Sequence, residues 1–288
     1  MTPAPDRFSQ FVAIDWSGAK GTRHKGIAVA CCAAGAARPA LIAPPDGTSA
    51  WSRTAVLDWL LLRRDQPMLV GFDFSFSAPF VSRGAHLPGE TNTTDAKALW
   101  AYVDAHCADI DLGAATFLEN RRGRHFYLGA ADGAKRDFLH WRVCEQRGDG
   151  TTKPSTVYDA IGAAQVAKAS FAGMRLLHRL DGRVPVWPFD PIPEQGALIV
   201  EIYTAIAARA TGLRRGLSKI RDAGSLDTAL AALGSAPHAP LAVYSDHATD
   251  ALMAAAWLRR IVGDPGLWHP EAMSEAVAAT EGWTFGVR

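Results

Sequence analysis

Short apolar runs separated by polar turns dominate the first quarter of the chain and return near residue 197. Apolar runs bounded by turn-forming residues are typical of buried strands. We therefore predict strands at 11–14, 26–32, 41–43, 68–72 and 197–200. Because only a short polar loop separates the first two, they are expected to form an antiparallel hairpin.

Other segments carry their apolar residues at helical spacing. Residues 51–64 form one such segment, with Thr48 or Ser49 as its expected N-cap. A strong helix is expected to begin within 245–250, with Ser245 or Asp246 as its N-cap. Hairpin strands followed by a crossover helix and a further strand indicate a mixed sheet, so the predicted fold class is α/β.

The pattern changes between residues 82 and 193, where apolar runs are scattered and basic and aromatic residues concentrate. Helices are predicted there at 94–107, 135–145 and 158–180. We interpret 82–193 as a large, mainly helical insertion. The core, 8–81 with 194–288, and the insertion then form one domain of 288 residues.

Composition narrows the functional classes. The chain is 48% hydrophobic and 20% charged, as in ordinary globular proteins, with a net charge of +1. A nucleic-acid partner would therefore be held by local basic patches. The four cysteines lack metal-binding spacing, and neither a signal peptide nor a membrane-spanning run is recognisable. We expect a cytoplasmic protein with reduced thiols and no membrane partner; its oligomeric state is not indicated.

Acidic residues end three of the predicted strands: Asp15, Asp73 and Glu201. Removing a carboxylate from water costs several kcal/mol unless something compensates it. Ligands of open α/β sheets lie beyond the carboxyl ends of the strands, where a metal ion would provide that compensation. The alternatives are that Asp15 or Asp73 caps a turn and that Glu201 pairs with an arginine.

The late helix offers Asp250 in its first turn, with Asp246 and His247 on the same face. The candidate metal ligands are therefore Asp15, Asp73, Glu201, Asp246 and Asp250. Converging carboxylates take up protons unless cations hold them ionised, and Mg²⁺ or Mn²⁺ is the fitting cofactor. Two such ions, bridged by a shared carboxylate, clamp both oxygens of a phosphodiester displacement. The alternative for Asp250 is that it only interacts favourably with the helix dipole.

Candidate substrate-binding residues come from two polar segments. Ser17, Gly18 and Lys20 follow the first strand, and Arg121, Arg122 and Arg124 concentrate positive charge in the insertion. Three like charges in four residues repel one another without an anionic partner, which favours binding to a nucleic-acid backbone. The alternative is an ordinary solvated face.

Several motifs, in this order, resemble one family: AIDWSGA, VGFDFSFS, VEIYTA, SDHATDAL and EGWTFGV. Together they are similar to the uncharacterised group of predicted RNase-H-like nucleases within the ribonuclease H-like superfamily. The resemblance implies that Asp15 and Asp73 are the central metal ligands and that Asp250 binds the second metal. It also implies that His247 is a ligand or proton shuttle. Glu201 departs from the simplest superfamily pattern.

The sequence thus predicts a metal-dependent enzyme that hydrolyses phosphodiester bonds of a nucleic acid or nucleotide. Asp15 would bridge two ions, Asp73 and Asp250 would complete their ligands, and His247 or Glu201 would orient water. One alternative is a phosphotransferase of the sugar-kinase and actin type, with the turn after Asp15 meeting ATP phosphates. The other is a catalytically silent nucleic-acid-binding module.

Overall fold

The sheet of the computed structural model, which describes residues 3, 6–147, 154–161, 166–213 and 219–288, has five strands in the order β3-β2-β1-β4-β5. The strands are β1 (Gln10–Asp15), β2 (Ala28–Ala33), β3 (Ala40–Ile42), β4 (Met68–Asp73) and β5 (Leu198–Glu201). Strand β1 is antiparallel to β2 and parallel to β4, which is parallel to β5. The predicted mixed α/β sheet is confirmed.

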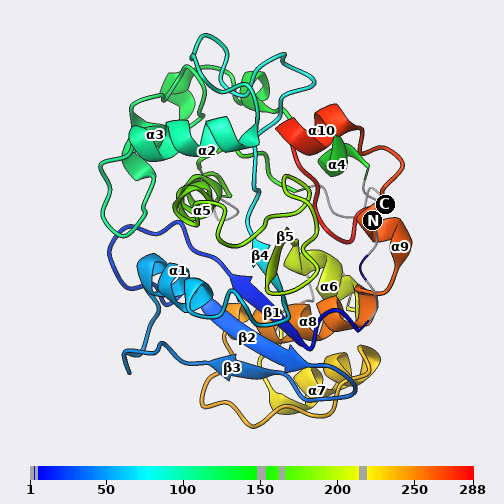
Figure 1. Cartoon of the computed structure of the whole chain (residues 1–288). Coiled ribbons are helices and arrows are strands. Elements are labelled where there is room, and N and C mark those ends of the chain that lie inside the picture. Colours follow the sequence, from blue (N-terminus) through cyan, green and yellow to red (C-terminus); the bar gives the residue numbers. More distant parts are fainter. Residues whose placement is uncertain (1–2, 4–5, 148–153, 162–165, 214–218) are drawn as a thin grey trace.

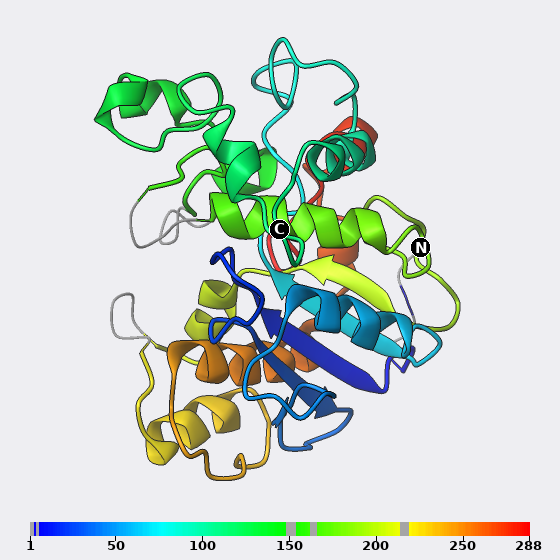
Figure 2. The same ribbon diagram turned by 90° about the vertical axis from the view of Figure 1, so that its left-hand side faces the viewer.

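Helices cover both faces of this sheet (Figures 1 and 2). On one face lie α1 (Arg53–Leu61) and α5 (Ala167–Arg179), and on the other lie α6 (Thr204–Ala210), α7 (Ala223–Ala232) and α8 (Asp246–Ile261). Alternate residues of β1 enter the two hydrophobic cores, because successive strand side chains point to opposite faces. Each face of the sheet therefore has its own apolar core.

Glycine allows one helix to lie close to the central strands. A Cβ atom at Gly71 of β4 would come within 2.7 Å of Ile202 Cγ2 and 2.8 Å of Leu258 Cδ1. Of the two predicted caps of α8, Ser245 is the one observed, with its Oγ accepting from Ala248 N at 3.2 Å. The cap of α1 is Ser52, not Thr48 or Ser49.

The segment 82–193 contains more irregular structure than its sequence pattern predicts. Its elements are α2 (Ala96–Ala105), α3 (Ala115–Glu119), the 3₁₀ helices η1 (Ala130–Asp132) and η2 (Lys135–Phe138), α4 (Val143–Gln146) and α5. Arg142 has an extended backbone, with ψ at 162°, which divides the predicted 135–145 helix into η2 and α4. The predicted 158–180 helix begins only at Ala167; residues 162–165 lie outside the described residues.

The chain ends in two short helices, α9 (Pro265–Trp268) and α10 (Glu275–Thr280). The segment that follows α10 returns to β5, where Phe285 N donates to Glu201 O at 2.8 Å. None of the described helices combines the length and apolar character needed to cross a membrane.

Candidate functional site

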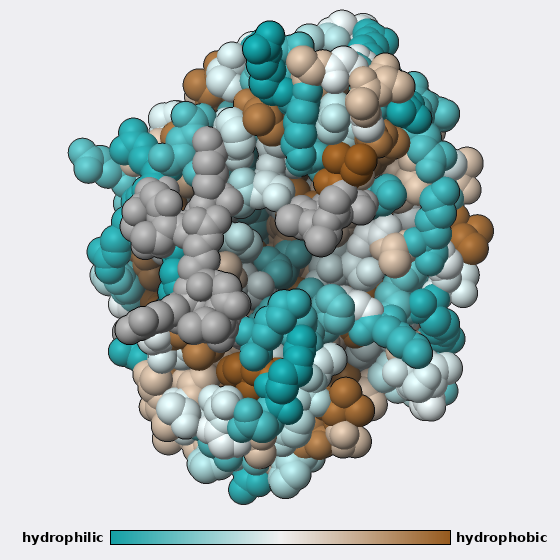
Figure 3. Space-filling view, turned by 180° about the vertical axis from the view of Figure 1, so that it is seen from behind, coloured by the Kyte–Doolittle hydropathy of each residue, from teal (hydrophilic) through white to brown (hydrophobic). Residues whose placement is uncertain are grey.

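Two predicted site residues are neighbours across the sheet. Strands β1 and β4 run parallel in register, so Asp15 lies directly opposite Asp73. Helix α8 begins at the same edge, where His247 Nδ1 lies 3.1 Å from Asp15 Oδ2. Figure 3 looks at the face toward which these strands run and shows a hollow in its middle. The tertiary structure therefore brings together residues that are far apart in sequence.

A cavity of about 660 Å³ opens at this edge. Its lining includes Asp73, His247 and Asp250. Asp15 lies behind this wall with 8% of its surface exposed, and its neighbours Trp16 and Ser17 line the cavity. We call Asp15, Asp73 and Asp250 the acidic edge.

Burial and mutual repulsion perturb the acidic edge. The pKa of Asp73 is raised to about 8, first by desolvation and then by the charges of Asp15 and Asp250. Hydrogen bonds from Thr204 oppose the shift; its Oγ1 donates to Asp73 Oδ2 at 2.8 Å. The pKa of Asp250 is raised to about 7 by desolvation and by the charges of Asp15 and Asp246. Such groups gather at functional sites.

His247 is the cationic partner of Asp15. Its hydrogen bond to Asp15 is the largest cause of its raised pKa, and burial acts against the rise. Desolvation raises the pKa of Asp15, with His247 opposing. The imidazole is 47% exposed at its side chain, so it connects the buried carboxylate with solvent.

Asp246 is predicted as a metal ligand, but the structure gives it other partners. Arg221 forms an ion pair with it, and Lys219 Nζ lies 3.4 Å from its Oδ2. These contacts, led by the Arg221 hydrogen bond, lower its pKa. Among the described residues that line the cavity, Asp246 is absent. It contributes charge near the site without joining the acidic edge.

Glu201 also lies apart from the acidic edge. Its carboxylate accepts from Arg142 at 2.7 and 2.5 Å. Phe76 N and Thr284 Oγ1 donate to the same carboxylate at 2.7 and 2.6 Å. Both oxygens thus take part in a buried ion pair with Arg142. This is the alternative in which Glu201 pairs with an arginine and does not bind a metal ion. We leave Glu201 out of the ligand set.

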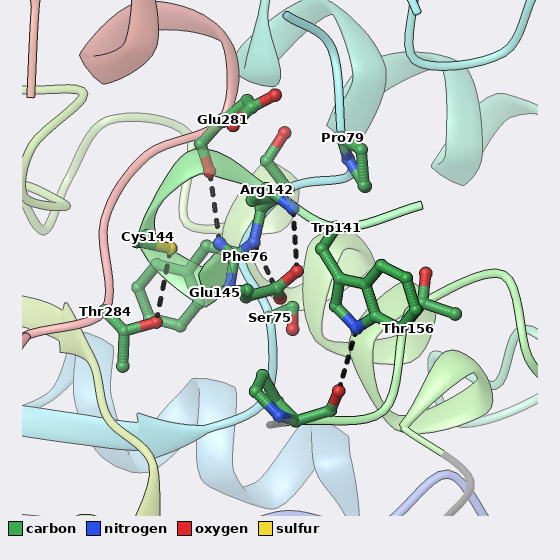
Figure 4. Close-up of polar contacts among 12 residues, drawn as sticks. Ser75, Phe76, Pro79, Trp141, Arg142, Cys144, Glu145, Thr156, Glu281 and Thr284 are labelled. Carbon is green, nitrogen blue, oxygen red and sulfur yellow. Dashed lines mark hydrogen bonds and ion pairs between the residues drawn. The ribbon is translucent and has the colours of Figure 1, made fainter. Parts of the chain in front are cut away.

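Arg142 belongs to a buried network that the sequence did not indicate (Figure 4). Its Nε donates to Glu145 Oε1 at 3.0 Å, and one terminal nitrogen donates to Glu281 O at 3.1 Å. The Glu281 carboxylate accepts from three backbone N–H groups, at Phe80, Val81 and Val143. We call Arg142, Glu145, Glu201 and Glu281 the arginine–glutamate network. It joins the segment 142–145 to β5 and the C-terminal region.

The loop after β1 is held in place from two directions. Arg53, fully buried, donates to Ser17 O at 2.9 Å and to Ala19 O at 2.6 Å. A Cβ atom at Gly18 would come within 2.3 Å of Ala169 N, so only glycine permits this contact with α5. Ser17 and Gly18 line the cavity, whereas Lys20 pairs with Glu119 at 3.1 Å. Lys20 is therefore engaged outside the cavity.

The cluster of Arg121, Arg122 and Arg124 has its anionic partners within the chain. Arg121 lies over the Phe117 ring and, with Arg124, faces Glu90 at 3.6 and 3.2 Å. Arg122 Nε lies 2.5 Å from Asp132 Oδ1. The expectation that these charges require an external anion is wrong, because Glu90 and Asp132 supply anionic partners from elsewhere in the chain.

The acidic edge fits Mg²⁺ or Mn²⁺ in its donor chemistry. Among the described residues, no three His, Cys, Asp or Glu side chains stand ready to hold one ion together. Mg²⁺ is commonly bound by only one or two carboxylates, with water and substrate phosphates as the other ligands. Pairs such as Asp15 with Asp73 match that requirement, and their repulsion is relieved by a cation.

Comparison with protein-family models, with curated proteins and with solved structures finds no match to this chain. Since one fold hosts many unrelated activities, the function has to be argued from the side chains at the site. Those side chains are three carboxylates with raised pKa values, one imidazole and one hydroxyl beside a cavity.

Proposed function

We propose that this chain is a metal-dependent nuclease of the RNase-H-like type, which hydrolyses phosphodiester bonds by a two-metal mechanism. The observation that carries the proposal is the register of β1 and β4, which sets Asp15 opposite Asp73. Helix α8 adds Asp250 to the same cavity wall. Carboxylates drawn together at a cost in repulsion are best explained by cations that bind between them.

The topology supports this proposal. The sheet has a hairpin of β1 and β2, a crossover through α1, and acids at the ends of β1 and β4. Helix α8 supplies a further acid, Asp250, which lies one turn after the start of the helix at Asp246 and so not in the first turn that the sequence predicts. This is the order of elements and acids that the resemblance to RNase-H-like nucleases implies.

In this site Asp15 and Asp73 would hold one ion, and Asp15 and Asp250 the second. The ions would supply positive charge at the phosphate and an acidified water molecule. Thr204 fixes the orientation of the Asp73 carboxylate, and His247 is held by Asp15. The water oxygen bonds to phosphorus as the ester P–O bond breaks. The half-exposed His247 is placed to pass a proton to the departing oxygen.

The direct test is calorimetric titration of Mn²⁺ and Mg²⁺ into the wild type and Asp15→Asn, with cleavage assays on single-stranded and duplex DNA and RNA. We expect Asp15→Asn to weaken metal binding at least ~10-fold and to reduce cleavage at least ~100-fold, because it removes a shared charged ligand.

Asp58→Asn is the matched control, since Asp58 is an exposed acid of α1 away from the cavity. It should leave metal binding and cleavage unchanged. Equal metal binding by the wild type and Asp15→Asn would contradict the proposed ligand set, and the absence of cleavage on every substrate would contradict the nuclease function.

A further inference from the structure

The cavity has the size of a small-molecule site. Its volume of about 660 Å³ lies within the range of roughly 300–1,000 Å³ that is typical of pockets enclosing compact ligands. Specific nucleic-acid interfaces, in contrast, are extended surfaces that follow many phosphates. A long strand that passes through the site needs an open path on both sides of the acidic edge.

One side of the cavity is closed by backbone contact. Gly18, in the loop after β1, approaches Lys168 and Ala169 so closely that a Cβ atom would lie 2.3–2.6 Å from them. Arg53 holds the two carbonyl groups that flank Gly18. A polynucleotide therefore has no passage between this loop and the start of α5.

Another side of the cavity is bounded by the C-terminal segment. Thr284 pairs with β5 in an isolated bridge to Glu201, and Phe285 N donates to Glu201 O at 2.8 Å. Arg142 reinforces the bridge by binding the Glu201 carboxylate. Beyond it, Val287 lines the cavity. The segment thus forms a second fixed wall.

The cavity also offers surface suited to a nucleobase. Half-buried Tyr203 and Ile206 line it together with the buried Ile202. Trp16 is another lining residue, and its indole Nε1 is buried without a hydrogen-bond partner among the described residues. A buried donor of this kind calls for an acceptor. Apolar walls with a few polar groups are typical of sites for compact, partly aromatic ligands.

The three arginines predicted to bind a nucleic-acid backbone do not extend the cavity into a longer binding surface. Arg121 and Arg124 pair with Glu90, and Arg122 with Asp132. None of the three is among the described residues that line the cavity. Because strand-binding surfaces gain affinity by neutralising many phosphates, these three paired arginines are poorly prepared to hold a long backbone.

From these observations we infer that the substrate is a compact phosphodiester of nucleotide size, namely a dinucleotide or the end of a strand, with one nucleotide unit inside the cavity. This inference rests on the proposed nuclease function. The products are one nucleoside monophosphate and one alcohol. Water supplies the oxygen bonded to phosphorus, and the departing oxygen takes up a proton.

Three substrates of matched chemistry test the inference with the full chain and Mn²⁺: a dinucleotide, a linear oligonucleotide, and the circle made by joining its ends. We expect cleavage of the first two and release of mononucleotides, with the circle at least ~100-fold slower because it presents no end. If only the dinucleotide is cleaved, the substrate is a free dinucleotide. If the linear oligonucleotide is cleaved as well, the end of a strand is also a substrate.

Binding of a nucleoside 5′-monophosphate with Mn²⁺, measured by calorimetry, gives a readout that does not depend on cleavage. Val287→Trp fills the cavity and should weaken this binding at least ~10-fold, whereas Val243→Trp, at a position 73% exposed and outside the lining, should not. Ile206→Phe, on another wall, provides a second variant should Val287→Trp misfold.

The two proposals fail differently. Equal cleavage of circle and linear oligonucleotide would overturn the compact-substrate inference and leave the nuclease function intact. Cleavage of none of the three would contradict the nuclease function. In that case the binding experiment still decides the size of the ligand, because failure of the monophosphate to bind would overturn the inference as well.

Discussion

Two groups of carboxylates lie near the same cavity, and they differ in whether the protein neutralises their charge. In the arginine–glutamate network, Arg142 and backbone N–H groups donate hydrogen bonds to the glutamate oxygens. At the acidic edge the partners are a hydroxyl from Thr204 and an imidazole from His247, and the carboxylates raise one another's pKa. The acids of the first group are neutralised by partners within the protein, whereas those of the second repel one another, and the proposed cations would relieve that repulsion.

This difference separates the two groups of acids more clearly than their positions in the sequence do. Glu201 and Asp73 both end buried parallel strands that are neighbours in the sheet. Glu201 forms a buried ion pair with Arg142, so its charge serves the fold. Asp73 keeps an uncompensated repulsion, which proteins retain chiefly where chemistry needs it. The predictions below test this contrast, from the largest expected effect to the smallest.

Loss of Arg142 should be the most damaging change. Arg142→Met leaves Glu145 and Glu201 as buried charges without their partner, which we expect to lower the free energy of unfolding by about 3–5 kcal/mol. Urea denaturation measures this loss. Arg136→Met, at a side chain 87% exposed, is the control and should change stability by less than about 0.5 kcal/mol. Similar values for both variants would refute a compensated network.

Neutralising one acid from each group should have opposite consequences. Glu201→Gln removes charge-assisted bonds to Arg142 and should lower the metal-free unfolding free energy by about 2 kcal/mol. Asp73→Asn relieves repulsion and should keep or raise metal-free stability at pH 8 while abolishing Mn²⁺ binding. Unfolding in EDTA and calorimetry distinguish the two. A clear loss of stability in Asp73→Asn would assign that residue a structural role.

The acidic edge should also set the pH dependence of stability. The folded-state pKa values of about 8 for Asp73 and about 7 for Asp250 exceed the ordinary value of 3.8. The folded state therefore binds more protons between these limits, and metal-free stability should fall as pH rises from about 4 to about 8. Thermal unfolding at pH 5 and pH 8 in EDTA measures this. Asp73→Asn should flatten the slope, and a slope of opposite sign would contradict the raised pKa values.

The smallest effect is expected in the insertion. The double variant Arg122→Gln, Arg124→Gln removes two charges that are paired with Asp132 and Glu90. Affinity for a nucleotide or an oligonucleotide should change by less than ~2-fold, since these cations do not reach the cavity. Fluorescence anisotropy measures this affinity. A tenfold loss of affinity would show that these arginines of the insertion do contribute to binding.

Local pattern carried much of the fold. Apolar runs predicted all five strands. In β1, β4 and β5 the run is apolar because the strand is buried on both faces, whereas β3 is a short, largely exposed edge strand. Ser245 indicated where α8 starts, because its hydroxyl can cap a helix and does so in the structure. Helices within 82–193 were predicted less well, because Arg142 bends the chain to reach partners distant in sequence.

Within the candidate site, the sequence by itself identified Asp15, Asp73, His247 and Asp250, since strand ends and helix starts can be recognised from short-range periodicity. Only the tertiary structure decided which acids are neutralised. Glu201 meets an arginine 59 residues away, and Arg121 and Arg124 meet Glu90, which precedes α2 and α3 in the chain. The energy of a buried charge depends on the groups within a few ångströms in space, and no local pattern specifies those groups.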